Sequence, residues 1–400
     1  MSESLGTAAA RFSAATSARA REATALLERL VNFDTGTHSL PAFGEPSIWI
    51  EGQLKDLGLA VQRHEFATAG PTVVGRASGR GRGRLLFLAH YDTVYEPGEP
   101  GRRPFRVDDG RAYGPGVADM KGGVVALWEA LRALRATGWD DFGTLTVIHN
   151  ADEETGSHTS RALIEAEGRK ADLCLVHEPG RPDGSVVTAR KGVGWYRLTV
   201  HGKAAHAGTH PRDGASAVVA LAHKILAIHA LNDFTRGVTF NVIVKEGGTR
   251  SNVVPNRAEA EIDLRLPTVA LGEEAVARLQ AVAKHEHLPG TRATLEGEVN
   301  RPPFEAGPQG RALFALAVEA AGALGMTLKA TSTGGGSDGN FVSALGVPVL
   351  DGLGAIGGAY HSPDEWLDLA SLPQRAALTA LLVWEISRRK AFLRQPERSG

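Results

Sequence analysis

Short apolar runs alternate with helical stretches through the first 190 residues, and this alternation constrains the fold more than any other feature. The runs Leu85–Ala89, Leu145–His149 and Asp172–Val176 have the length and composition of buried strands. Helical stretches near 122–135 and 159–166 separate them. Strands joined by helices of this length pair in parallel within one sheet. The pattern therefore predicts an α/β fold.

The pattern changes between residues 191 and 303. Ala258–Leu266 alternates small or apolar residues with charged ones, as a half-buried antiparallel strand does. The helix–strand alternation resumes at Gly310. We therefore expect 191–303 to be a smaller α+β domain inserted into a larger one, which 1–190 and 304–400 form together.

The balance of charge argues against two classes of partner. The chain has 44 Lys and Arg against 45 Asp and Glu, so its net charge gives no reason to expect nucleic acid or an anionic membrane. No apolar run approaches the roughly 20 residues that span a bilayer, and residues 1–20 lack the apolar centre of a secretory signal. The one cysteine, Cys174, lies between leucines and is expected to be a buried structural thiol. These features predict a cytoplasmic protein.

Ionisable side chains lie where the predicted strands end. In LFLAHYDTV, His90 and Asp92 are two residues apart and project from the same side at the carboxyl end of Leu85–Ala89. Open α/β sheets place their sites at such ends. Asp92 could bind one imidazole nitrogen of His90 while the other nitrogen binds a metal. A capping histidine and a turn-forming aspartate would fit equally well.

Four more motifs carry candidate metal ligands. Asp119 in GPGVADMKGG precedes a predicted helix, where it is either an N-cap or a carboxylate that bridges two cations. Glu153 and Glu154 in NADEETGS follow a strand directly, as an acidic turn that is either solvated or held by a cation. Glu178 in LVHEPGR ends another strand, and His361 in GGAYHSPDEW lies in a loop, where a lone histidine is more often structural.

Besides Asp92, these candidates supply two imidazoles and four carboxylates. This donor set suits Zn²⁺, with Co²⁺ or Mn²⁺ possible, and the lack of thiolates argues against a structural zinc site. A bridging carboxylate with further ligands on each side fits a two-metal site. Such a site also needs a carboxylate that binds no metal and transfers the proton, and Glu153 is the candidate.

In these five motifs and their order, the chain resembles the dinuclear zinc peptidases that include glutamate carboxypeptidase, acetylornithine deacetylase, succinyl-diaminopimelate desuccinylase and aminoacylase. The resemblance runs from His90 through the final helix and includes an insertion of matching position and size. It implies a zinc-exopeptidase-like catalytic domain with a mixed central sheet flanked by helices. It also implies that 191–303 is a dimerisation or lid domain, so that the protein is a homodimer.

The resemblance assigns a role to each candidate residue. It implies two zinc ions per chain, one held by His90, Asp119 and Glu178 and the other by Asp119, Glu154 and His361. Asp92 would orient His90, and Glu153 would be the general acid/base. His206 in HGKAAHAG would stabilise the oxyanion in the partner subunit's active site. The residues that resemble the family's substrate-binding positions are Asn252, Arg265, Arg301, Gly335 and Gly336.

The expected reaction is metal-dependent hydrolysis of an amide bond that releases a C-terminal amino acid, as in glutamate carboxypeptidase. The substrate would be a small N-acyl amino acid or a short peptide. The alternative is an N-acyl-amino-acid deacylase of the acetylornithine deacetylase or aminoacylase kind. A non-catalytic relative would have lost a ligand or Glu153, and a mononuclear hydrolase would need Asp119 to be only an N-cap.

Overall fold

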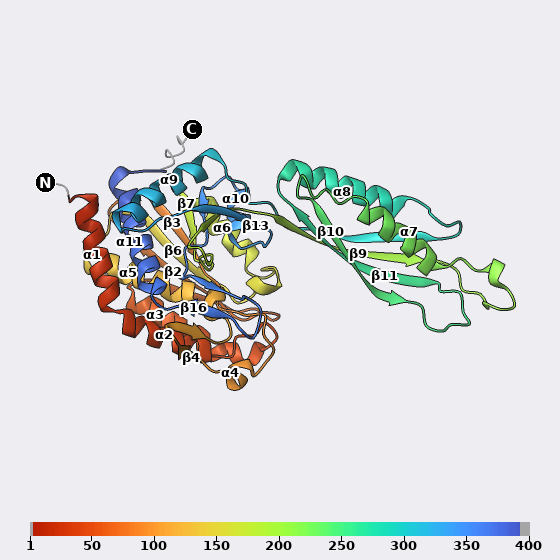
Figure 1. The fold of residues 1–400 in the computed structure, drawn as a ribbon, viewed down its shortest axis with the longest axis horizontal. Coiled ribbons are helices and arrows are strands. Elements are labelled where there is room, and N and C mark those ends of the chain that lie inside the picture. The colour runs from red at the N-terminus through yellow and green to blue at the C-terminus, as the bar shows by residue number, and fades with distance from the viewer. Residues whose placement is uncertain (1–2, 393–400) are drawn as a thin grey trace. The chain divides into compact units, whose positions relative to one another are not determined.

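The structure is a computed structural model that describes residues 3–392 (Figure 1). The chain divides into two compact units. The larger unit contains the described residues up to Thr188, Ala306–Ser332 and the residues from Ser337 on. The smaller unit contains Ala189–Glu305 and Thr333–Gly336.

A six-stranded mixed sheet lies at the centre of the larger unit, in the order β1-β2-β6-β3-β7-β14. β6, β3, β7 and β14 are parallel, whereas β1 and β2 run antiparallel to their neighbours. Only the short segment 65–71 joins β1 to β2, and a parallel crossover needs a dozen or more residues. The strands are β1 (Ala60–His64), β2 (Thr72–Ser78), β3 (Arg84–Leu88), β6 (Thr144–His149), β7 (Leu173–Val176) and β14 (Val349–Leu350).

Helices flank this sheet, which confirms the expected fold class. α5 and α11 pack against each other on one side, and α6 and α10, which contact β3 and β7, lie on the other (Figure 1). α5 is buried along most of its length, and so are β3 and β7. The helices are α1 (Leu5–Ala18), α2 (Ala20–Asn32), α3 (Gly44–Asp56), α4 (Glu99–Arg102), α5 (Gly123–Ala136), α6 (Arg161–Lys170), α9 (Pro308–Ala323), α10 (Gly339–Ala344) and α11 (Ser371–Arg389).

Shorter strands and helical turns make up the rest of the larger unit, and β8 and β13 lie where the chain passes to the smaller unit. A second sheet has the order β15-β16-β5-β4, and β8 pairs with β13. Three short helical turns lie between longer elements: η1 precedes α3, η2 precedes α5 and η3 follows β6. The bounds are β4 (Arg106–Asp108), β5 (Arg111–Tyr113), β8 (Val186–Arg190), β13 (Ala330–Thr333), β15 (Gly357–Gly358), β16 (Trp366–Asp368), η1 (Leu40–Phe43), η2 (Val117–Gly122) and η3 (Glu153–Thr155).

The smaller unit is an antiparallel four-stranded sheet, in the order β10-β11-β9-β12, with two helices packed on one face. β11 alternates buried and partly exposed residues along its whole length, as the sequence pattern predicts. Its charged side chains therefore lie on the face that the helices do not cover. The elements are β9 (Gly192–His201), η4 (Pro211–Asp213), α7 (Ala217–His229), β10 (Thr239–Gly247), β11 (Arg257–Leu266), α8 (Val269–Lys284) and β12 (Arg292–Arg301).

Across residues 3–392, the helices are all too short or too polar to traverse a lipid bilayer.

Candidate metal centre

The site lies at the carboxyl ends of three neighbouring parallel strands. β6, β3 and β7 lie side by side in one direction, so the loops that follow them start at the same edge of the sheet. These loops carry five of the side chains expected at strand ends: His90, Asp92, Glu153, Glu154 and Glu178.

Two imidazoles approach the Asp119 carboxylate, one at each oxygen. His90 Nε2 lies 3.3 Å from Asp119 Oδ1, and His361 Nε2 lies 3.3 Å from Asp119 Oδ2. Glu178 Oε1 is 3.7 Å from His90 Nε2, and Glu154 Oε2 is 3.4 Å from His361 Nε2. Ligand atoms of His90, Asp119 and Glu154 all lie within 4.8 Å of one another. The ion-pair distances therefore define two sets of side chains that share Asp119. One set contains His90 and Glu178, and the other contains His361 and Glu154.

The chemistry of this cluster fits a divalent metal ion. His90 is 2% exposed, and its Nε2 is buried without a hydrogen-bond partner among the described residues. The other ring nitrogen, Nδ1, lies 3.3 Å from Asp92 Oδ1. Buried polar atoms nearly always form a hydrogen bond, so an imidazole nitrogen that makes none and lies among carboxylates is an available metal ligand. Imidazole with carboxylate oxygen is a donor set of the kind zinc binds.

The electrostatics of the cluster favour positive charge. The carboxylates of Asp119 and Glu154 raise the pKa of His361 to about 11. Burial raises the pKa of Glu154 to about 7. Burial would also raise the pKa of Asp119, but the neighbouring His361 and His90 outweigh it and hold that pKa below its usual range. The cluster thus attracts a cation, whether a proton or a metal ion.

Asp119 is not the N-cap of the helix that follows it. α5 begins at Gly123 and its N-cap is Gly122. Asp119 lies within η2, where its backbone and that of Met120 leave helical geometry. The carboxylate is therefore directed to the two histidines rather than to a helix end.

Asp92 links the first histidine to the acidic turn. Its Oδ1 accepts the Glu153 backbone N–H at 3.3 Å, and its Oδ2 accepts the Glu154 N–H at 3.1 Å. With His90 Nδ1 beside it, the fully buried carboxylate joins the loops after β3 and β6.

Asp152, the first acid of the turn, has a different role from Glu153 and Glu154. Its carboxylate accepts hydrogen bonds from the backbone and hydroxyl groups of Thr159 and Ser160, and it is 3% exposed. Asp152 is therefore occupied in holding the turn together, while Glu154 joins the cluster and Glu153 remains half-buried beside it.

Sequence reasoning missed two buried ionisable groups behind this cluster. The carboxylate of Glu365 accepts hydrogen bonds from the backbone around Asp119. Lys121 is fully buried, with Nζ 3.4 Å from the Phe33 carbonyl oxygen, and burial lowers its pKa to about 7. The only available signals were the position of Glu365 four residues after His361 and that of Lys121 two residues after Asp119.

In the smaller unit, the structure brings His206 and Asn252 together. His206 pairs with Val253 in an isolated bridge, and the Ala207 N–H donates to the Asn252 carbonyl oxygen at 3.0 Å. His206 is exposed, and its Nδ1 accepts the backbone N–H groups of Gly208 and Thr209, each at 3.1 Å. Since Nδ1 is an acceptor, the proton of the neutral ring is on Nε2.

The other expected substrate-binding residues of this unit form a second group. Arg265 Nη1 donates to the Gly334 carbonyl oxygen at 3.3 Å. A Cβ at Gly336 would lie 2.7 Å from Arg301 Cδ, so the glycine packs directly on that side chain. Arg190, which sequence reasoning missed, donates to the carbonyl oxygens of Gly335 and Gly336. The expected residues thus divide between this group and the His206–Asn252 pair.

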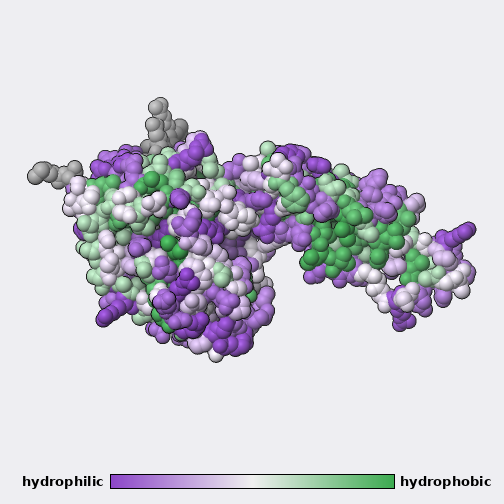
Figure 2. All heavy atoms as spheres, viewed as in Figure 1, coloured by the Kyte–Doolittle hydropathy of each residue, from purple (hydrophilic) through white to green (hydrophobic). Residues whose placement is uncertain are grey.

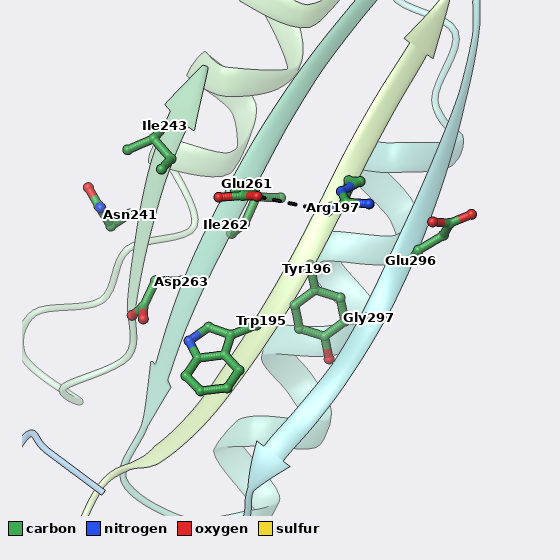
Figure 3. Close-up of a pocket in the computed structure, with 10 residues that line it drawn as sticks. All are labelled: Trp195, Tyr196, Arg197, Asn241, Ile243, Glu261, Ile262, Asp263, Glu296 and Gly297. Carbon is green, nitrogen blue, oxygen red and sulfur yellow. Dashed lines mark ion pairs between the residues drawn. The ribbon is translucent and has the colours of Figure 1, made fainter. Parts of the chain in front are cut away.

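The open face of the small sheet contains a hollow of about 600 Å³ (Figure 3). Trp195 and Ile243 supply apolar walls, and Arg197 forms ion pairs with Glu259 and Glu261 across the strands. The residues that line it include none of the metal-cluster side chains. The hollow is therefore a feature of the smaller unit alone.

Comparison with known proteins identifies the family. The model of peptidase family M20/M25/M40 matches residues 86–385. The chain belongs to this family. It is 35% identical to carboxypeptidase G2 of Pseudomonas sp. (strain RS-16) over 368 residues, which cover 90% of this chain and 88% of that protein. It is 29% identical to succinyl-diaminopimelate desuccinylase of Halorhodospira halophila over 328 residues, covering 78% and 85%.

Solved structures of the M20 fold match almost the whole chain. Aminopeptidase PepT from Bacillus cereus ATCC 10987 has a TM-score of 0.74 at 24% identity, covering 92% of this chain and 99% of that one. The M20 family metallo-carboxypeptidase Sso-CP2 from Sulfolobus solfataricus has a TM-score of 0.71 at 18% identity, covering 90% and 98%. Membership of the M20 family makes this chain a metal-dependent hydrolase, and its similarity to carboxypeptidase G2 makes it carboxypeptidase-like.

Proposed function

We propose that this chain is a dizinc carboxypeptidase that hydrolyses the amide bond before a C-terminal amino acid. The observation that carries the proposal is the placement of His90 and His361 at the two oxygens of Asp119. His90, Asp119 and Glu178 would hold one ion, and Asp119, Glu154 and His361 would hold the other. Zinc suits these ligands, and cobalt or manganese could replace it. When bound, the ions would polarise the scissile carbonyl group and lower the pKa of a water molecule.

Glu153 is the proposed general acid/base. Its backbone N–H is held by Asp92, and none of the cluster distances requires its carboxylate as a ligand. The carboxylate would accept a proton from the attacking water and return that proton to the nitrogen of the leaving amine. General acid–base catalysis of this kind contributes about 10²–10⁴-fold to the rate.

Residues of the smaller unit would bind the rest of the substrate. His206 would donate its Nε2 proton to the carbonyl oxygen as negative charge develops there. Arg265 and Asn252 would bind the α-carboxylate, for which a guanidinium is well shaped. Arg301 would lie near that carboxylate, and Gly335 and Gly336 would lie beside the substrate backbone.

We also propose that residues 191–303 join two copies of the chain, with His206 acting in the partner's active site. β10 is an edge strand, and it exposes Ile243 (48%) and Val244 (57%). α7 packs against β10 and exposes Leu226 (68%), and Figure 2 shows hydrophobic side chains gathered on this unit. An exposed apolar edge strand invites pairing with another chain. The cytoplasmic location expected from the sequence stays a prediction.

Replacement of Glu153 tests the catalytic role. We expect Glu153→Ala to lose at least 10²-fold in kcat, because the proposed proton acceptor is removed, while metal content stays near that of the unmodified protein. Rates and metal content by atomic emission measure both quantities. Near-normal turnover in the variant would remove Glu153 from this role.

A substrate panel tests the specificity. N-acyl amino acids and dipeptides that differ in the C-terminal residue, and then in the acyl group, would be assayed with Zn²⁺ and with chelator. Metal-dependent cleavage confined to C-terminal glutamate or aspartate supports the carboxypeptidase assignment. Preference for a basic or neutral residue under a small acyl group would favour a deacylase instead. No metal-dependent cleavage would contradict the proposal.

A further inference from the structure

Glu365 is a buried carboxylate that none of the proposed catalytic steps uses. It lies four residues after His361, is 1% exposed and immediately precedes β16. Its Oε1 accepts the backbone N–H groups of Ala118 and Asp119, each at 2.9 Å. Its Oε2 accepts the Gly116 N–H at 3.0 Å. One side chain thus binds three donors in the segment that carries Asp119.

This segment needs an acceptor from outside itself. Gly116 is the N-cap of the turn η2, and Ala118 and Asp119 lie in its first turn, where backbone N–H groups have no acceptor within the turn itself. Buried N–H groups left without partners are costly. A buried carboxylate is costly too, unless several hydrogen bonds compensate it. Glu365 and the Gly116–Asp119 backbone satisfy each other.

Tyr95 connects the same carboxylate to the segment of His361. The Tyr95 hydroxyl lies 2.7 Å from Glu365 Oε2 and 2.8 Å from the carbonyl oxygen of Ser362, the residue after His361. Arg103 donates to the Pro363 carbonyl oxygen at 2.8 Å and lies over the Tyr95 ring. Glu365 therefore binds the Asp119 segment directly and belongs to the His361 segment, where Tyr95 supports it.

We propose that Glu365 is a positioning residue that fixes Asp119 relative to His361 and so sets the affinity for the metal ion that these two residues would share. The inference rests on the proposed dinuclear site. It assigns Glu365 no contact with substrate or metal. Groups that orient metal ligands in this way are typically worth about 10–100-fold in metal affinity.

Metal-binding titrations of the chelator-treated protein test this role without any substrate. The unmodified chain, Glu365→Gln and Glu365→Leu would be titrated with Zn²⁺ against a chromophoric chelator. We expect Glu365→Leu to weaken the binding of at least one ion by about 10–100-fold. Glu365→Gln keeps one oxygen for the Ala118 and Asp119 N–H groups, so its loss should be smaller. Tyr95→Phe should weaken binding less than either.

A second buried glutamate provides the matched control. Glu129 on α5 is 2% exposed and pairs with Arg19 at 2.7 Å and Arg132 at 3.2 Å. Its replacement in Glu129→Gln also removes a buried charge from the larger unit, so it should lower the Tm of the metal-free protein and leave zinc affinity unchanged.

Three outcomes would overturn the proposal. These are unchanged zinc affinity in Glu365→Gln or Glu365→Leu, equal losses in Glu129→Gln, and additive effects of Tyr95→Phe and Glu365→Gln in a double-mutant cycle, where a shared function predicts coupling. If Glu365→Leu does not fold, Glu365→Gln and Tyr95→Phe decide the question. Zinc binding without cleavage by the unmodified chain would contradict the proposed function and leave this inference intact.

Discussion

The Arg265 side chain near the end of β11 already forms the contact that a substrate carboxylate would need. Its Nε lies 2.7 Å from Asp263 Oδ1 and its Nη2 lies 2.9 Å from Asp263 Oδ2, a two-point pairing with a carboxylate. The guanidinium is partly exposed, so a carboxylate from solution could replace Asp263 as its partner. The planar donor pair of arginine matches two carboxylate oxygens, whereas lysine offers a single point charge.

Arg265→Lys should therefore slow the hydrolysis only of substrates that have a free C-terminal carboxylate. Hydrogen bonds to charged groups contribute about 1.5–3 kcal/mol, so we expect kcat/KM for such a substrate to fall by about 10–100-fold. The matching C-terminal amide, which lacks the charge, should be hydrolysed as slowly by the variant as by the unmodified enzyme. Equal losses on the two substrates would show that Arg265 does not bind the carboxylate.

At the scale of elements, the His149 ring joins β6 to its neighbours. His149 ends β6 and is fully buried. Its Nε2 accepts the Trp128 indole N–H from α5 at 3.0 Å, and its Nδ1–H donates to the Ala89 carbonyl oxygen after β3 at 2.8 Å. Burial lowers the pKa of His149 to about 4, from an ordinary value of 6.5. The folded protein therefore holds this ring neutral.

This ring should make stability depend on pH in the acid range. Above pH 6.5 the ring is neutral in both states, so its contribution to stability is complete. Between pH 6.5 and 4 only the unfolded chain binds the proton, so the free energy of unfolding decreases as the pH is lowered. Below pH 4 both states bind the proton and this decrease levels off. At pH 5 the loss should be about 2 kcal/mol. Urea unfolding at pH 7 and pH 5, with chelator present so that metal release does not contribute, measures it.

His149→Gln provides the control for this prediction. Glutamine keeps one donor and one acceptor but does not titrate. The variant should be less stable overall and should lose about 2 kcal/mol less than the unmodified protein between pH 7 and pH 5. An identical loss in the two proteins would mean that other groups cause the acid sensitivity.

At the scale of the whole molecule, residues of two chains form the proposed active site. The expected metal ligands and Glu153 belong to the larger unit, and His206 belongs to the smaller one. If His206 acts in the partner's site, each site needs its own Glu153 and the partner's His206. A dimer of one Glu153→Ala chain and one His206→Ala chain would then contain one intact site.

Mixing the two inactive variants should therefore restore activity. Random exchange at equal amounts makes half of the dimers hybrids with one intact site of two, so about a quarter of the unmodified activity should return. Activity would be measured before and after subunit exchange. With Val244→Lys added to both chains, the charge at the β10 edge should prevent pairing and abolish the recovery. No recovery despite proven exchange would place His206 outside the partner's site.

How far the sequence predicts the site depends on the range of each interaction. His90, Asp92 and Glu178 follow short buried strands, so the rule for parallel sheets placed them at one edge. The antiparallel β1–β2 pair and helix α1 were not predicted, and the role of Arg190 was missed. In the acidic turn, the local pattern does not separate Asp152 from Glu154, because all three adjacent acids fit it. Only the family resemblance singled out Glu154.

The sequence by itself determined the alternation of strands and helices, the positions of His90, Asp92 and Glu178 at strand ends, and the amphipathic β11. These follow from periodicity, which fixes the side of an element that is buried. Only the tertiary structure decided that Asp119 faces two histidines, that Asp152 holds its own turn and that Glu365 binds the Asp119 segment. Glu365 and Asp119 are 246 residues apart. Such contacts depend on the path of the whole chain, and no local pattern encodes them.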